Sequence, residues 1–293
     1  MENKSQKYRL LHNPLVVGAS EPVIFYIAFY LMLLIYGPVF ENFGTGDAYL
    51  YEFATLGTYF VSYLLMISFT LVYMLIADKK SLKVFTNGGF KKSIIAVLAG
   101  VGLGFCFNAF ISLTVAATGS VTFSFNKFVW YMPFMFLLLS VPALAEEVLL
   151  RGYVPAFLEE KLDMSAVAFF SGVLFIPHHI ENLKLYGFDT LFCLNVFLLG
   201  VFMYFLVKYT GNFWICAGFH TAWNFTQMFL FGLPNSGLSS CIALFAGNDV
   251  KNNFFYNSVY GYEGSLFTSL LIGLAVVVMA WMLHKKNNPA VTK

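Results

Sequence analysis

The sequence predicts an all-α, polytopic membrane protein with about eight transmembrane helices and both termini in the cytoplasm. Of its 293 residues, 59% are hydrophobic and only 11% are charged, and the mean hydropathy is +0.74. Soluble domains carry about 25% charged residues, so this chain has too few charges to solvate a water-exposed surface. The apolar runs are long and show no alternating polarity, which favours helices over barrel strands. We therefore expect residues 1–293 to form a single transmembrane domain.

Apolar stretches of about the 20 residues that a helix needs to cross a bilayer recur along the chain. The first is predicted to be a span and not a signal peptide, because its apolar core is too long and no small-residue cleavage site follows it. The fifth is short and contains Pro177. The spans are expected at residues 22–40, 53–77, 93–117, 128–147, 165–180, 190–208, 212–231 and 265–283.

The longest expected loop, residues 232–264, is rich in Asn, Gly and Ser. Its apolar patch at 241–246 is too short to span a bilayer, so we expect the patch to lie at the membrane interface or to cover the bundle. No internal repeat accompanies these elements, so the inverted repeats of many transporters are missing from this sequence.

Lysine and arginine residues orient the chain, because the cytoplasmic segments of membrane proteins carry an excess of them. With the N-terminus inside, 14 of the 17 Lys and Arg residues, Arg151 among them, fall in inner segments. Only Lys127, Lys184 and Lys251 fall in outer loops. An even number of spans preserves this separation, and the pattern predicts a multi-pass protein of the cell membrane with lipid as its surroundings.

The net charge and the positions of the cysteines argue against a nucleic-acid-binding protein and against a fold held by disulfides or by a thiolate metal site. A net charge of +2 with no long basic run argues against nucleic acid as a partner. The four cysteines are scattered and include no C-x-x-C pair, which argues against a disulfide framework or a thiolate metal site.

Glu146, Glu147 and Arg151 form the first polar cluster, at the expected inner end of the fourth span. Ionisable groups within a span are costly and mark candidate functional sites. Glu147 and Arg151 are four residues apart, share a helix face and are expected to pair. Glu146 is turned by about 100° from Glu147 and stays available as a general base. A structural ion pair at the end of the helix is the alternative for this cluster.

Phe175 and the histidine pair at 178–179 end the short fifth span and form the second cluster. Phe175 and His179 share a helix face, so the aromatic ring would shield the imidazole from lipid. The residues alone do not select between His178 and His179. A histidine at the membrane interface, bonded to water or carbonyl groups, is the alternative for this cluster.

His220 and Asn224 form the third cluster, four residues apart on one face of the apolar seventh span. An unsatisfied imidazole or amide costs several kcal/mol in lipid, so both side chains are expected to have partners. Aimed at one point they would form an oxyanion hole, whereas hydrogen bonding between helices is the alternative. Together the clusters would supply a base, a water-orienting imidazole and an oxyanion clamp. No Ser–His or Cys–His nucleophile pair accompanies them, which favours activated water over a covalent intermediate.

With these motifs the sequence resembles the CAAX protease and bacteriocin-processing (CPBP, or Abi) family of intramembrane glutamic endopeptidases. The family motifs E-E-x-x-x-R, F-x-x-x-H and H-x-x-x-N match residues 146–151, 175–179 and 220–224. The resemblance covers about residues 140–226, the expected catalytic core, and leaves the first three spans and the last one without a motif. It implies an intramembrane protease with eight helices.

The resemblance also implies a role for each motif residue. It assigns the activation and holding of water to Glu146 and His179, and the stabilisation of the oxyanion to His220 and Asn224. No metal is expected, although two histidines and a carboxylate are a ligand set that zinc accepts. The supporting residues that the resemblance implies are Glu147, Arg151 and Phe175.

We expect a hydrolase that cuts a peptide or membrane-protein substrate, in peptide or bacteriocin maturation or in self-immunity. The alternative is a non-enzymatic immunity or scaffold protein that keeps the motifs for helix packing, and a proton-coupled transporter is a weaker one. The expected spans place Glu146 near the inner end and His179 near the outer end, whereas a working site needs both at one depth. Either the segment 149–163 re-enters the membrane or the fifth helix ends in mid-bilayer.

Overall fold

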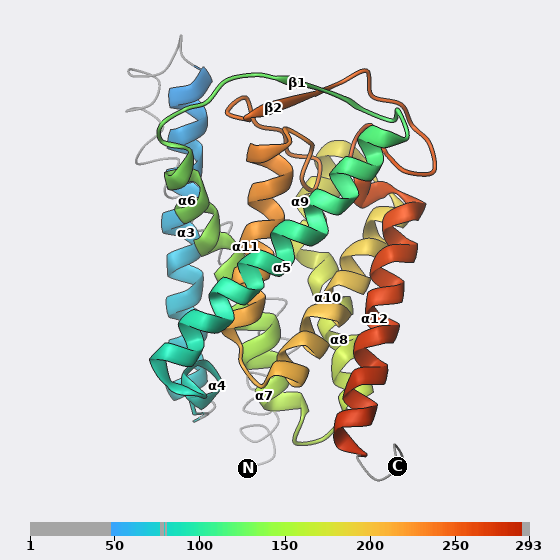
Figure 1. Ribbon diagram of the computed structural model, residues 1–293. Coiled ribbons are helices and arrows are strands. Elements are labelled where there is room, and N and C mark those ends of the chain that lie inside the picture. Colours follow the sequence, from blue (N-terminus) through green and yellow to red (C-terminus); the bar gives the residue numbers. More distant parts are fainter. Residues whose placement is uncertain (1–47, 77–78, 80, 289–293) are drawn as a thin grey trace.

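The structure is a computed structural model that describes residues 48–76, 79 and 81–288 (Figure 1). The first expected span, at 22–40, lies outside the described residues, and so do both termini. Figure 1 shows the described chain as a bundle of helices with a pair of short strands lying across one end. The expected all-α, polytopic membrane fold is confirmed, because six described helical rods are long and apolar enough to cross a membrane.

These six rods, and the α11 rod, which is not one of the six, are of two kinds, single helices and composite ones. The single helices are α3 (Ala48–Ile76), α5 (Gly89–Ala117), α10 (Thr190–Thr210) and α12 (Leu266–Asn287), with the short α4 (Lys83–Thr86) before α5. Each composite rod contains a π- or 3-10-helical turn. The first consists of α6 (Met132–Glu147), η1 (Val148–Tyr153) and α7 (Val154–Leu158), and the second of α8 (Met164–Phe175), η2 (Ile176–His179) and α9 (Ile180–Tyr186). The third consists of α11 (Trp214–Phe225) and η3 (Thr226–Leu230).

The α11 helix is the centre of the bundle. It is shorter than the outer rods, yet every residue from Ile215 to Trp223 is buried. A helix that is buried on all sides must be surrounded by other helices, and α5, α6 and α10 are packed against it. The polar residues of the expected seventh span therefore lie inside protein and not against lipid.

Glycines allow α5 and α11 to approach until their backbones touch. A Cβ atom at Gly100 or Gly104 of α5 would collide with a carbonyl oxygen of α11, at Ile215 or Phe219. In the other direction, a Cβ at Gly218 of α11 would collide with the backbone of α5. Small residues four apart are typical of closely packed membrane helices, and here they set the position of α11.

The fourth expected span, 128–147, ends too early. The rod continues from Met132 through η1 to Leu158, over 27 residues. Arg151, which the sequence assigned to an inner segment, therefore lies within the span, and its side chain is fully buried. Its charge is paired with that of Glu147, so the helix can continue past residues whose charge suggested the end of a span.

The loop 232–264, here called the cap, covers one end of the bundle. Of the two placements expected for its apolar patch, the membrane interface or a cover over the bundle, the structure shows the second. Its strand β2 (Phe245–Asn248) pairs antiparallel with β1 (Thr122–Phe125), a small sheet that the all-helical prediction did not include. Ile242 and Ala243, in the apolar patch, are buried, and Ile242 packs beside Phe229 at the end of η3. The cap is thus part of the folded core and closes the bundle from that side.

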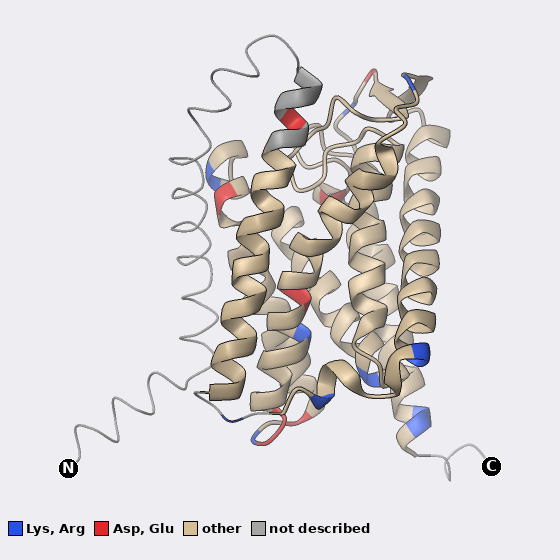
Figure 2. Ribbon diagram, turned by 90° about the vertical axis from the view of Figure 1, so that its left-hand side faces the viewer, with Lys and Arg blue, Asp and Glu red and all other residues tan. Residues whose placement is uncertain are grey.

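Lysine and arginine are distributed unevenly between the two ends of the bundle. Figure 2 shows most of them toward the end opposite the cap, among the described residues. The asymmetry agrees with the distribution that was used to orient the chain.

Candidate active site

The first cluster lies midway along its membrane-spanning rod, where α6 passes into the π-helical turn η1. Arg151 Nη1 donates to Glu147 Oε1 over 3.1 Å, and neither side chain has any exposed surface. The expected i, i+4 pair is therefore present. π-Helical turns widen a helix locally and are frequent at functional sites, and this one carries Arg151 away from the regular α-helical ladder.

Arg151 is held from two further directions. Its Nη2 donates to the carbonyl oxygen of Gly200 on α10 over 3.1 Å, and its guanidinium carbon lies 4.7 Å from the centre of the Phe175 ring. Gly200 lies so close to Gly172 of α8 that a Cβ at either position would collide with the facing helix. Close contact between α8 and α10 thus brings the carbonyl acceptor and the aromatic ring to the same arginine.

His220 lies between the two glutamates. Its Nδ1 lies 2.9 Å from Glu147 Oε1, and its Nε2 lies 3.8 Å from Glu146 Oε2. A carboxylate only accepts hydrogen bonds, so Nδ1 carries the proton and Nε2 faces Glu146. Glu146 remains free of Arg151, as the helical spacing predicted, and the tertiary fold turns its carboxylate toward the second nitrogen of the imidazole.

His179 occupies the 3-10 turn η2 and lies next to Phe175. Its Nδ1 lies 3.1 Å from the carbonyl oxygen of Phe175, which can only accept, so the proton is on Nδ1 and Nε2 is left as an acceptor. The Phe175 ring meets both imidazoles edge-on, with ring centres 5.1 Å apart for His179 and 5.7 Å apart for His220. Phe175 therefore forms a wall that both histidines share.

A small cavity joins the second and third clusters. Its volume is about 20 Å³, which is room for about one water molecule. His179 contributes to the lining and His178 does not, so the structure separates two histidines that the sequence left equivalent. Glu146 is not a lining residue and adjoins the cavity through His220. The cavity is lined by Phe175, His179, Asn195, Val196, Leu199, His220, Trp223, Asn224, Ser236, Glu263, Thr268 and Ile272.

The conflict in depth between Glu146 and His179 disappears in the structure. Glu146 is near the middle of the rod from Met132 to Leu158, and not near its inner end. The fifth rod does not end at residue 180, because α8 passes through η2 into α9 and reaches Tyr186. The two residues meet around His220 because both rods are longer than the apolar stretches that predicted them.

Sequence reasoning missed Glu263, a carboxylate that lines this cavity itself. Glu263 lies in η4 (Tyr262–Gly264), at the end of the cap, and is 8% exposed. It accepts from Trp223 Nε1 over 2.9 Å and from the backbone N–H of Ser236 over 2.6 Å. Burial raises the pKa of its carboxyl, while these hydrogen bonds oppose that rise. An acid in an Asn- and Gly-rich loop is expected to be solvated, so nothing local in the sequence distinguishes it.

The donors at the site do not form a metal centre. In the part of the chain that the structure describes, no group of three or more His, Cys, Asp or Glu side chains is placed to hold a metal ion. The Nδ1 atoms of His179 and His220 are engaged by a carbonyl and by Glu147, an arrangement that leaves each Nε2 free. The described residues do not fit a zinc site because these two histidines and Glu146 do not form such a group of three, and the expected independence from metal stays a prediction.

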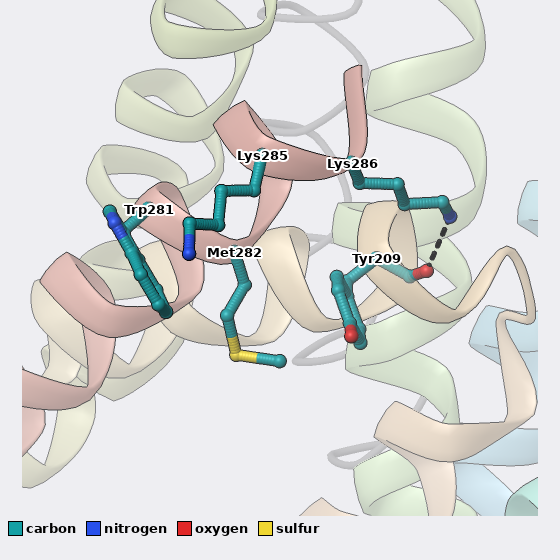
Figure 3. Close-up of a pocket in the computed structure, with 5 residues that line it drawn as sticks. All are labelled: Tyr209, Trp281, Met282, Lys285 and Lys286. Carbon is teal, nitrogen blue, oxygen red and sulfur yellow. Dashed lines mark hydrogen bonds between the residues drawn. The ribbon is translucent and has the colours of Figure 1, made fainter. Parts of the chain in front are cut away.

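A second pocket lies at the C-terminal ends of α10 and α12 (Figure 3). It has a volume of about 590 Å³ and is lined by Tyr209, Trp281, Met282, Lys285 and Lys286. Lys286 Nζ donates to the carbonyl oxygen of Tyr209 over 2.7 Å, and Lys285 Nζ lies 4.1 Å from the Trp281 ring centre. Aromatic residues and lysines of this kind are common where helices leave a membrane. No carboxylate or imidazole lines this pocket, whereas His179, His220 and Asn224 line the smaller cavity, which Glu146 adjoins through His220.

The fold and the buried cluster define a class: a multi-pass membrane protein with carboxylates and imidazoles in contact inside its helical bundle. Residues 128–226 match the family model described as type II CAAX prenyl endopeptidase Rce1-like, which confirms the resemblance found in the motifs. The match runs from before α6 to the end of α11, with η1 and η2 between them, and thus includes every motif residue. It indicates a CAAX-protease-like hydrolase of a membrane. No curated protein and no solved structure matches the chain.

Proposed function

We propose that this protein is an intramembrane endopeptidase of the cell membrane that hydrolyses a peptide bond with water activated by Glu146. The observation that carries the proposal is the position of His220 between two carboxylates, with Nδ1 on Glu147 and Nε2 facing Glu146. A structural ion pair alone would need only Glu147 and Arg151. The second carboxylate, left without an arginine partner, is what general-base chemistry requires.

In the proposed reaction Glu146 takes a proton from water as the water oxygen attacks the carbonyl carbon of the substrate. The carbonyl oxygen becomes an oxyanion, which the Nε2 of His220 and the side-chain amide of Asn224 stabilise as donors. The C–N bond then breaks, and the proton on Glu146 passes to the leaving nitrogen. Because Nδ1 is committed to Glu147, His220 donates from Nε2 only as an imidazolium, and its two carboxylate neighbours suit that charge.

His179 contributes an acceptor to this scheme. Its Nδ1 proton is used by the carbonyl of Phe175, so its free Nε2 accepts from the second O–H of the attacking water. The small cavity that it shares with His220 has room for about one water. Arg151, Glu147 and Phe175 support the site by fixing the imidazole of His220 and the turn that carries His179.

The substrate we propose is a peptide or a membrane protein, in peptide or bacteriocin maturation or in self-immunity. Supporting this class are the burial of the site inside the bundle and the family match over 128–226. A non-enzymatic membrane immunity or scaffold protein is the alternative, and the same experiment separates the two.

The test is a peptide-library cleavage assay on detergent-purified protein, comparing wild type with Glu146→Gln. We expect the variant to lose about 10²- to 10⁴-fold in kcat, because the amide cannot accept the proton of water. The matched control is Glu159→Gln, which removes a carboxylate from a partly exposed pair with Lys208 and is expected to retain activity. A chelator is expected to leave wild-type activity unchanged.

Other outcomes of this assay have definite readings. Cleavage by Glu146→Gln at the wild-type rate would contradict the proposed role of Glu146. Activity lost with the chelator and restored by zinc would contradict the metal-free mechanism. A wild-type protein that folds, inserts and cleaves no peptide would favour the scaffold.

A further inference from the structure

Asn224 has an amide whose orientation matters for the proposed reaction. As an oxyanion donor it must present its NH₂ group, and not its carbonyl oxygen, to the cavity that it lines. Nothing on α11 itself determines which of the two ends faces the cavity. The neighbouring cap does, because Asn235 Nδ2 lies 3.2 Å from Asn224 Oδ1.

The orientation of Asn235 is determined by two groups that can only accept. One is the carboxylate of Glu263, whose Oε1 lies 3.3 Å from Asn235 Nδ2. The other is Oε1 of Gln227, also 3.3 Å away. Gln227 cannot be turned around, because its Nε2 donates to the carbonyl oxygen of Pro234 over 2.5 Å. Asn235 must therefore direct its NH₂ group toward this cluster.

Glu263 is in turn held as an acceptor from several sides. Trp223 Nε1 donates to its Oε1, and the backbone N–H of Ser236 donates to its Oε2. The main chain of Glu263 is tied to α10, where Asn195 Nδ2 donates to its carbonyl oxygen over 2.7 Å. Donors from α11 and from the cap thus surround a single buried carboxylate at the rim of the cavity.

We infer that Asn235 and Glu263 of the cap are positioning residues, which orient the amide of Asn224 so that its NH₂ group donates to the oxyanion. The chain of contacts runs from Glu263 to Asn235 and from Asn235 to the Oδ1 of Asn224, and it leaves Nδ2 of Asn224 for the cavity. This inference rests on the proposed function. It gives the cap, which lies outside the family match at 128–226, a part in the chemistry of the site.

The test replaces Asn235 by a residue of the same shape that cannot donate. In Asn235→Asp a carboxylate faces the Oδ1 of Asn224, so the Asn224 amide is expected to turn and to present its oxygen to the cavity. Losing one oxyanion donor costs about 10²- to 10³-fold in kcat, and we expect about 10- to 100-fold here, with KM changed much less. The matched control is Asn126→Asp, which loses a hydrogen bond to the Ala243 carbonyl of the cap and touches no site residue.

Two further readouts separate positioning from a general loss of structure. In an Asn224→Ala background, Asn235→Asp is expected to change kcat by less than about 2-fold, because its target is already gone. Lowering the pH protonates the introduced carboxyl, which then donates an O–H to Asn224, so the ratio of variant to wild-type activity is expected to rise. The negative charge of Glu263 favours that protonation. His179, His220 and Glu146 titrate in both proteins, so their effect cancels in the ratio of variant to wild-type activity.

A second variant protects the test against misfolding. Glu263→Gln keeps the size of the side chain, and its amide can turn a donor toward Asn235, so a milder loss of kcat is expected. Melting temperature and elution in detergent report folding for each protein. If the folded Asn235→Asp variant matches wild type at every pH, or its effect is undiminished in the Asn224→Ala background, the inference is overturned. A wild type that cleaves no peptide overturns the proposed function instead.

Discussion

Glu147 is the residue that holds the candidate site together. Its Oε1 accepts from Arg151 Nη1 over 3.1 Å and lies 2.9 Å from His220 Nδ1, so one buried oxygen joins α6, η1 and α11. Removing one partner of such a pair leaves an uncompensated charge in a low-dielectric interior, which is the costly case. At this scale, structure and function depend on the same contact.

Replacing Arg151 by methionine is therefore expected to destabilise the fold by about 3–5 kcal/mol, because the carboxylate of Glu147 stays buried without the positive charge of the guanidinium. Unfolding in detergent, followed by temperature or denaturant, measures the change. The comparison is Lys208→Met, which breaks a partly exposed pair with Glu159 and is expected to cost no more than about 1 kcal/mol. Equal losses for the two variants would show that burial of the pair is not what matters.

At the scale of elements, the close contact between α5 and α11 decides where His220 lies. Gly100 and Gly104 repeat at four residues and face the backbone of α11, as a closely packed membrane pair requires. Gly102 lies between them in sequence but on another face, where a Cβ atom would have no neighbour within 4 Å. The same residue type thus packs at one position and faces open space two residues away.

This contrast predicts opposite effects for one methyl group. Gly104→Ala is expected to destabilise by about 1–3 kcal/mol, because the methyl meets the backbone of Phe219, which cannot move aside. Gly102→Ala is expected to be neutral or to stabilise by up to about 1 kcal/mol, since alanine favours a helix and nothing opposes it. Melting temperatures of the two variants in one detergent test this, and equal shifts would contradict the packing.

At the scale of the whole molecule, the cap is fastened to a helix far away in sequence. Glu52 of α3 accepts from both the backbone N–H and the thiol of Cys241, over 3.0 and 2.9 Å. Burial, and after it the hydrogen bond and charge of Glu52, raise the pKa of the Cys241 thiol to about 11. The thiol therefore reports whether the cap rests on α3.

Removing that carboxylate is expected to lower the pKa of Cys241. A negative acceptor favours the neutral thiol, so Glu52→Gln increases the thiolate fraction, and each unit of lowering raises it about tenfold at a pH below the pKa. The partial desolvation of this exposed thiol remains, so the pKa returns only part of the way to its ordinary value. Alkylation of Cys241 at pH 8, followed by mass spectrometry, is expected to quicken several-fold. Glu181→Gln serves as control, and equal rates in all proteins would refute the contact.

Local geometry explains how much of the site the sequence predicted. Residues four apart on a helix share a face. The ion pair of Glu147 with Arg151 and the contact between the rings of Phe175 and His179 could therefore be predicted without tertiary structure. The expected spans were less accurate. Charges that are neutralised inside the bundle resemble, in sequence, the charges that mark the end of a helix.

The sequence by itself determined the membrane class, the helical fold and the motif residues, because composition and spacing act through local physics. Only the tertiary structure decided that Glu146 faces His220, that His179 and not His178 reaches the cavity, and that Glu263 is buried there. The partners Glu147 and His220 are 73 residues apart, and Trp223 and Glu263 are 40 apart. Contacts between residues so far apart in the sequence depend on how the helices and the cap pack, and no periodic pattern of residues encodes that packing.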